Sequence, residues 1–246
     1  MRHHLLEGLL RRLAHSPVRN DFVLRGGLMT RVWSPGRSTQ DLDLVGDHDF
    51  DVAMTTERLR AIGQVSIDDG LQVDGAAVRT KGIWLHTAFP GIRAQIPVGF
   101  GETVIVVTAD VGYGDPLVPP AQEMDYPSLI GAPPHIRACA PETQVAWKLH
   151  GLAECGPRFR PKDLADLCRI IKGVPLEDAV LTPAIDAAFA SRGFSYESAR
   201  TTLSAAHWTA KSASRRWRDS ETPGDLQTTL ETVRKRLAAA LARLPA

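Results

Sequence analysis

The stretch "FVLRGGLMTRVWSPGRSTQDLDLVGD", residues 22–47, contains the pattern that decides the fold. Near its end Asp41 and Asp43 alternate with Leu42 and Leu44. Because strand side chains alternate between two faces, a strand here puts both leucines on one face and both carboxylates on the other. Neighbouring like charges repel each other, so this arrangement is poor for stability alone. The run therefore predicts a divalent cation between the carboxylates, against the simpler alternative of an acidic outer strand face.

Two glycines, Gly26 and Gly27, stand between a short apolar run and an expected helix over residues 28–33. Glycines at such a place let the backbone approach a phosphate closely, and the N–H groups of the helix start would face that phosphate. The following turn, residues 34–39, adds three candidate phosphate contacts, namely Arg37, Ser38 and Thr39. Mg²⁺ binds a few carboxylates and leaves its other positions to water and phosphate oxygens, so the stretch predicts Mg²⁺, with Mn²⁺ as the second candidate.

Bulk properties indicate an ordinary soluble globular protein. The chain has 246 residues, 43% of them hydrophobic, and a formal net charge of +1, which argues against a general nucleic-acid coating protein. Its three cysteines form no CxxC pair, which fits a reducing cytosol and gives neither a disulfide framework nor a zinc site. The N-terminal apolar run is too short for a signal peptide or a membrane span. We therefore expect a cytoplasmic protein without a membrane partner.

The order of elements predicts an α+β fold. Strand-like segments fill residues 64–110, including 71–80, 82–89, 92–100 and 103–111, and helices are expected at 4–14 and 54–63. A proline-rich extended connection is expected over 112–141. Almost everything after it has helical periodicity, with helices expected at 142–154, 162–172, 183–191, 196–218 with breaks, and 224–244. The division predicted is an α/β core over residues 1–125 and a mainly helical domain over 126–246.

A second polar pattern lies in the helical half. In the expected helix over 142–154, Lys148 falls in one row with Val145 and Leu152. Its ammonium can reach solvent or pair with Asp163, or it can bind a triphosphate as a mobile point charge. Asp163 opens the next expected helix, where an acid can simply complement the helix dipole. Both alternatives stay open for each residue.

Together these residues resemble a known superfamily. The order hydrophobic-Gly-Gly, a spacer, then Asp-hydrophobic-Asp-hydrophobic is similar to that of DNA polymerase β-like nucleotidyltransferases, and "LRGGL…RSTQDLDL" most resembles their AbiEii/AbiGii toxin branch, which includes the MenT-type toxins. In that branch a lysine precedes an Arg-x-Lys-Asp segment that often continues to a second Asp. The matching positions here are Lys148, Arg160, Lys162, Asp163 and Asp166. The resemblance covers roughly residues 20–170.

The resemblance implies a mixed nucleotidyltransferase-type sheet flanked by helices and a role for each matched residue. Asp41 and Asp43 would be catalytic and hold the metal, and Lys148 and Asp163 would be the other catalytic residues. The nucleotide would be bound by Gly26, Gly27, Arg37, Ser38, Thr39, Lys148, Arg160 and Lys162. The reaction implied is transfer of NMP from an NTP to an RNA acceptor, with tRNA the first candidate. The biological setting implied is a toxin–antitoxin or phage-defence system with a cognate antitoxin.

One segment departs from the family pattern. Where relatives have a run like "QIDVGFGD", residues 95–102 read "QIPVGFGE", so Pro97 takes the place of an acid. Glu102 is five residues on, roughly 16 Å along an extended strand, and cannot simply replace it. We expect activity to be retained. The two alternatives are transfer to a small molecule such as an aminoglycoside hydroxyl, and a catalytically degenerate nucleotide-binding module.

The C-terminal helices offer a candidate RNA surface. Lys211, Arg215 and Arg218 recur at steps of four and three residues, with Trp217 beside them. Such a stripe can bind phosphates while an exposed indole stacks on a base. The alternative is a solvated basic face with the tryptophan packed inward.

Overall fold

A computed structural model of the chain describes residues 1–220, 222 and 224–245. The chain divides into two compact units. The first comprises Met1–Asp115 and Ala121–Cys139, and the second comprises Pro116–Pro120 together with the chain from Ala140 onward. Residues 126–139, which were expected in the second domain, lie in the first unit.

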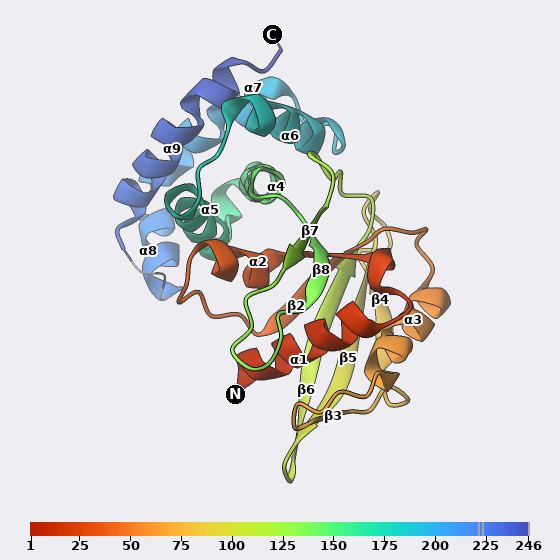
Figure 1. The fold of residues 1–246 in the computed structure, drawn as a ribbon. Helices are drawn as coiled ribbons and strands as arrows, with labels where there is room; N and C mark the ends of the chain where they lie inside the picture. Colours follow the sequence, from red (N-terminus) through yellow and green to blue (C-terminus); the bar gives the residue numbers. More distant parts are fainter. Residues whose placement is uncertain (221, 223, 246) are drawn as a thin grey trace. The chain divides into compact units, whose positions relative to one another are not determined.

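The first unit is built on a mixed sheet that has eight strands among the described residues (Figure 1). The strand order is β3-β5-β6-β2-β1-β8-β7, and β4 pairs with β5. The pairs β2–β6 and β1–β8 are parallel, and the other pairs are antiparallel. The bounds are β1 Phe22–Arg25, β2 Asp41–Gly46, β3 Leu71–Val73, β4 Arg79–Ile83, β5 Gly91–Phe100, β6 Thr103–Gly112, β7 Gln122–Asp125 and β8 His135–Ala138. The expected mixed sheet flanked by helices is confirmed.

Three helices belong to this unit, α1 (Arg2–His15), α2 (Gly26–Trp33) and α3 (Val52–Gln64). The first buries one apolar stripe at helical spacing, made of Leu5, Leu6, Leu9, Leu10 and Leu13. Full burial of one such leucine stabilises the fold by roughly 1.5–3 kcal/mol. The third helix begins after Asp51, whose side chain accepts a hydrogen bond from the backbone N–H of Met54 at 2.8 Å and so caps the helix.

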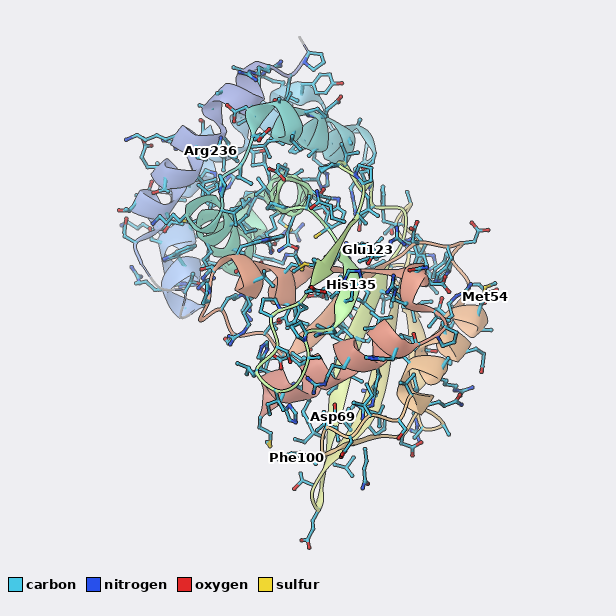
Figure 2. All side chains as sticks on the ribbon, viewed as in Figure 1. Met54, Asp69, Phe100, Glu123, His135 and Arg236 are labelled. Atoms are coloured by element: carbon cyan, nitrogen blue, oxygen red, sulfur yellow. The ribbon has the colours of Figure 1, made fainter. Side chains whose placement is uncertain are left out.

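A buried ion pair ties α1 to the loop before β3. Arg12 donates to both carboxylate oxygens of Asp69, at 2.9 and 3.1 Å, and Arg11 donates to the same carboxylate at 3.0 Å. Asp69 is labelled in Figure 2. Burial opposes the charge on Asp69, but the hydrogen bonds from Arg12 and Arg11 outweigh it and hold the pKa of this carboxyl below its ordinary value.

Three predictions for this region need correction. Of the strand expected over 71–80, only 71–73 (in β3) and 79–80 (at the start of β4) are in strands. Of the strand expected over 82–89, only Gly82 and Ile83 are in β4, and the chain then turns. In the turn, Leu85 packs against Gly82 and Trp84 against Gly91, where an added Cβ would come within 2.8 and 2.9 Å of these side chains. The connection expected over 112–141 contains β7 and β8, which pair with each other, while β8 also pairs with β1.

The second unit contains α4 (Pro141–Cys155), α5 (Pro161–Gly173), α6 (Asp178–Ala190), α7 (Tyr196–Thr201), α8 (Lys211–Asp219) and α9 (Leu226–Ala242). The helix expected over 196–218 is therefore broken, and two short 3₁₀ turns, Thr202–Ser204 and Ala206–Thr209, fill the gap. That these helices form a separate domain stays a prediction. Within the described part of the chain, no helix combines the length and the apolar character needed to cross a bilayer.

Candidate active site

The two aspartates of β2 stand on the opposite face of the strand from its leucines. Leu42 and Leu44 are 4% and 0% exposed, whereas Asp41 is exposed and Asp43 is half-buried. The alternation predicted from the sequence is confirmed. We call this side of the sheet the polar face, defined by Asp41 and Asp43 and by the residues that lie level with them on neighbouring strands.

The parallel strand β6 brings a third carboxylate to the polar face. In the ladder, Asp43 is level with Asp110 and Asp41 with Thr108. Residues at matching positions of paired strands point to the same side of a sheet. The side chain of Asp110 is 16% exposed. Three carboxylates therefore occupy adjacent positions on two neighbouring strands.

An arginine of β5 neutralises part of this charge. Arg93 is level with Asp110 in the antiparallel ladder, and its Nε and Nη2 donate to the two carboxylate oxygens at 2.8 and 2.7 Å. Hydrogen bonding to Asp110 and the charge of that carboxylate raise the pKa of Arg93, and Asp41 and Asp43 add to the shift in the same direction. Both β2 carboxylates thus act on the same guanidinium.

The reading of Pro97 as the missing acid is wrong. Pro97 lies on β5 opposite Val106, so β6 separates it from β2. The segment with the family spacing is instead "DVGYGD", residues 110–115, which begins with Asp110. The sequence contains two similar runs, at 95–102 and 110–115, and only the second lies beside β2. Asp115, the second acid of the segment, accepts from Arg25 Nη1 at 2.6 Å.

The start of α2 lies against the same face on the other side of β2. Gly26 has φ +72°, and a Cβ on it would come within 2.1 Å of Asp43 Oδ2. A Cβ on Gly27 would come within 2.3 Å of Thr39 Oγ1, and the backbone N–H of Gly27 donates to Asp43 Oδ2 at 3.3 Å. Two glycines are therefore needed for this close approach.

Of the predicted phosphate contacts in the loop after α2, one hydroxyl lies beside the helix start and one does not. Thr39 is half-buried beside Gly27, whereas Ser38 is exposed. The backbone carbonyl of Arg37 accepts a hydrogen bond from Arg31 Nη1 at 3.2 Å, which anchors the loop to α2. Of the two loop hydroxyls, that of Thr39 thus lies against the helix start, and the loop backbone is anchored to α2.

The donors on the polar face fit a hard divalent cation by their chemistry. Mg²⁺ needs only one or two protein carboxylates beside water and phosphate oxygens, and Asp41 and Asp43 are such donors. Among the described residues, no group of three or more His, Cys, Asp and Glu side chains stands ready to hold a metal ion. Asp110, the third acid, has both oxygens engaged by Arg93.

In the second unit, Lys148 is enclosed by acids. Its side chain is 13% exposed, and Nζ donates to Asp163 Oδ1 at 3.2 Å and to Asp166 Oδ2 at 3.1 Å. Burial disfavours the ammonium, but the charges of the two carboxylates outweigh burial and raise the pKa of Lys148. Arg160 pairs with Asp163 at 2.7 Å, and Arg169 pairs with Asp166 at 2.9 Å.

Pairing of Lys148 with Asp163, one of the two alternatives drawn from the sequence, is therefore present. The roles predicted for Lys148, Arg160, Lys162 and Asp163 at a nucleotide stay predictions. On α8, Lys211, Arg215 and Arg218 are exposed, and their predicted RNA contact also stays a prediction.

Trp217, the aromatic residue beside that stripe, is turned inward. It is 3% exposed, and its Nε1 donates to the carbonyl of Gly224 at 2.9 Å. An indole buried in this way cannot stack on a base. The inward-packed alternative drawn from the sequence is correct for this side chain.

Comparison with known proteins identifies the family. A family model described as "Nucleotidyl transferase AbiEii toxin, Type IV TA system" matches residues 8–243. JHP933 from Helicobacter pylori has a similar structure, with a TM-score of 0.44 and 12% identity over 99% of this chain and 91% of that one. A second H. pylori structure, that of a nucleotidyltransferase candidate, has a TM-score of 0.42 and 13% identity over 99% and 94%. No curated protein sequence matches the chain. The match to nearly the whole chain shows that the protein belongs to the AbiEii family of nucleotidyl transferase toxins.

Proposed function

We propose that the protein is a Mg²⁺-dependent enzyme that transfers NMP from an NTP to an RNA acceptor, with tRNA the first candidate. The observation that carries the proposal is the ladder of β2 and β6, which sets Asp41, Asp43 and Asp110 on one face beside the start of α2. Carboxylates next to a helix N-terminus suit a ligand that has both a metal ion and phosphates. Such a ligand is a nucleoside triphosphate bound with Mg²⁺.

In this proposal each group has one task. Asp41 and Asp43 hold the metal, which when bound stabilises the charge that develops on the attacking and leaving oxygens. The start of α2 at Gly26 and Gly27, with the hydroxyl of Thr39 or Ser38, holds the triphosphate tail. Asp110 accepts the proton of the acceptor hydroxyl.

The reaction is an exchange of one phosphorus–oxygen bond for another. The hydroxyl oxygen of the acceptor forms a bond to the α-phosphorus, and the bond from that phosphorus to pyrophosphate breaks. The hydroxyl proton passes to Asp110 and then to solvent. Arg93 orients Asp110 through its two hydrogen bonds. Lys148, with Arg160 or Lys162, is proposed from the family resemblance to neutralise phosphate charge.

The setting proposed follows from the family. An AbiEii toxin implies a cognate antitoxin and a role in toxin–antitoxin or phage-defence systems, and NTP and RNA substrates imply the cytoplasm. Asp110 also removes the reason for expecting a degenerate module, since that expectation depended on Pro97.

The test is a labelling assay with each α-labelled NTP in turn, Mg²⁺ and total tRNA. We expect labelled RNA with the wild type and a rate at least about 100-fold lower in Asp110→Asn, since a positioned general base contributes roughly 10²–10⁴-fold. Asp43→Asn should lose the label as well. Glu102→Gln is the matched control. Glu102 is the acid of the similar segment at 95–102 and is exposed in the hairpin between β5 and β6, so this variant should keep the wild-type rate.

Two results would contradict the proposal. Label that appears on an aminoglycoside but on no RNA would favour the small-molecule enzyme. NTP binding by the wild type without transfer to any acceptor would favour the degenerate module. Thermal unfolding of each variant shows whether a lost activity reflects lost structure.

A further inference from the structure

The polar face carries a second group of like charges, on the strands beyond β6. Arg79 and Lys81 on β4 are exposed, and Lys81 is level with Arg93 on β5. Thr80 between them hydrogen-bonds to Thr56 of α3 at 2.6 Å, so it points to the opposite, helix-covered face. Strand alternation then directs Arg79 and Lys81 to the polar face. We call Arg79, Lys81 and Arg93 the cationic band.

The band has little to neutralise it within the folded chain. Across the described residues, neither Arg79 nor Lys81 has an ion-pair partner, and Arg93 pairs with Asp110. Like charges directly opposite each other on paired strands are destabilising, and Lys81 faces Arg93 in this way. The sheet therefore separates charge along one face, with carboxylates on β2 and β6 and cations on β4 and β5. A ligand that meets both needs a metal ion at one end and anionic groups at the other.

The strand order gives the band a place in the reaction. In an in-line displacement the attacking and leaving oxygens lie on opposite sides of the phosphorus. The start of α2, where we place the triphosphate tail, lies on the β1 side of β2. The cationic band lies on the other side of β2, beyond β6 and Asp110. The acceptor must then reach the α-phosphate from the side of the band.

We propose that the cationic band binds the sugar–phosphate backbone of the acceptor RNA next to its reactive hydroxyl. This inference rests on the proposed function and adds to it the surface that holds the acceptor. Residues two apart in a strand are roughly 6.6 Å apart, which is comparable with the spacing of successive phosphates in an extended single strand. Arg79 and Lys81 can therefore bind neighbouring phosphates, while Arg93 links them to the carboxylates. Such contacts position RNA without reading its sequence.

The experiment measures binding of a 5′-fluorescein-labelled single-stranded RNA by fluorescence anisotropy over a series of salt concentrations, without NTP. Arg79→Gln/Lys81→Gln removes two charges from the band. Lys172→Gln/Lys235→Gln removes two charges from exposed positions on α5 and α9 and is the matched control. Equilibrium binding of NTP with Mg²⁺ and thermal unfolding are measured on the same samples.

The slope of log K against log salt should fall in magnitude by about 1.4 in the band variant, because each phosphate neutralised on a single strand contributes roughly 0.7. At about 0.1 M salt the affinity should fall on the order of 25-fold. NTP binding should stay at the wild-type value, and KM for RNA should rise. The unfolding midpoint should not fall, because Lys81→Gln removes the repulsion from Arg93. The control should keep the wild-type slope.

An unchanged slope in the band variant overturns the inference, even if the wild type transfers nucleotides to RNA. An equal loss of slope in the control also overturns it, because net charge alone would then explain the effect. If the slopes of the wild type and the band variant differ as expected but the wild type transfers nothing to RNA, the proposed function is overturned and the RNA-binding surface is retained. The two proposals can therefore fail separately.

Discussion

At the scale of single residues, strand register decides which acid completes the site. Asp110 is level with Asp43 although more than sixty residues separate them along the chain. Arg93 reaches Asp110 because it occupies the matching position on the next strand. A guanidinium that uses both oxygens of a carboxylate competes with any metal ion that needs one of them. Arg93 should therefore set how easily a divalent cation enters the site.

Arg93→Gln should bind Mn²⁺ more tightly in the absence of RNA. Removing the guanidinium leaves the three carboxylates with less positive charge nearby, so a divalent cation gains attraction and loses a competitor. We expect a Kd about tenfold lower, which corresponds to roughly 1.4 kcal/mol. Isothermal titration calorimetry with Mn²⁺ measures this directly.

Arg60→Gln is the control for this experiment, because Arg60 lies on α3 and pairs with Glu57 away from the carboxylates. Its Kd for Mn²⁺ should equal that of the wild type. Weaker Mn²⁺ binding in Arg93→Gln would show that the arginine organises the carboxylates for the metal rather than competing with it.

Site residues that depend on local structure could be predicted from the sequence, whereas those that depend on the pairing of distant strands could not. The two-residue period of a strand is local, so the outward direction of Asp41 and Asp43 could be predicted from five consecutive residues. The pairing of β2 with β6 is not local, and two similar segments, at 95–102 and 110–115, competed for one role. A sequence alone does not say which of two strands lies beside a third.

At the scale of elements, the site depends on the close packing of β2 and its preceding loop against the first residues of α2. The helix starts at Gly26 with Asp43 and Thr39 packed against its first two residues. A side chain at Gly27 has no room, because the Cβ position is 2.3 Å from Thr39 Oγ1 and 2.7 Å from Thr39 Cβ. The helix start and the loop before β2 therefore act as one packed part.

Two glycine-to-alanine substitutions should have opposite effects on stability. Gly27→Ala should lower the free energy of unfolding by roughly 1–3 kcal/mol through overpacking. Gly151→Ala, in the interior of α4, meets atoms no closer than 3.5 Å and should raise it by up to about 1 kcal/mol through helix propensity. Urea unfolding measures both.

Thr39→Gly removes the atoms that the new methyl group would meet, so the double variant tests the cause. Gly27→Ala/Thr39→Gly should recover part of the loss, with a coupling energy of roughly 0.5–3 kcal/mol. Additive effects of the two substitutions would show that the methyl group does not meet Thr39.

Elements with strong local periodicity were predictable, and short ones were not. The helix expected at 4–14 is α1, and those expected at 142–154 and 162–172 are α4 and α5, because each has an apolar stripe several turns long. By contrast, β7 and β8 have four residues each and lie among prolines, and they are held by pairing with each other and, for β8, with β1. Breaks were expected within 196–218, but their positions are set by short turns that periodicity does not reveal.

At the scale of the whole molecule, the chain contributes to each unit twice. After Asp115 it gives Pro116–Pro120 to the second unit, returns to the first for β7 and β8, and then enters α4. Thr143 and Trp147 of α4 bind the carbonyls of Val118 and Pro116, at 2.7 and 3.1 Å. Trp147 therefore contributes to packing within the second unit through this hydrogen bond.

Within the second unit, the charged state of Lys148 should stabilise the fold up to high pH. Its pKa is raised in the folded chain, so the stabilisation is complete below the unfolded pKa of about 10.4 and is lost as pH rises through the folded pKa. Lys148→Met leaves the acids Asp163 and Asp166 without their shared cation and should cost about 3–5 kcal/mol at neutral pH. The difference from the wild type should shrink above about pH 10.4, as measured by urea unfolding across the pH range.

Lys172→Met is the control, because this lysine is exposed near the end of α5, and its effect should be small at every pH. Adding Asp166→Asn to Lys148→Met should recover part of the lost stability. A Lys148→Met variant as stable as the wild type but unable to transfer nucleotides would contradict a structural role and assign the lysine to chemistry.

The long separation between β2 and β6 has a consequence for how such a toxin is made. A chain still on the ribosome that has emerged only as far as β5 contains Asp41 and Asp43 but has no partner for that edge of β2. On the proposed mechanism, the proton acceptor joins the metal-binding pair when β6 docks beside β2. Translation can therefore produce much of this polypeptide before any of it can damage the cell that makes it.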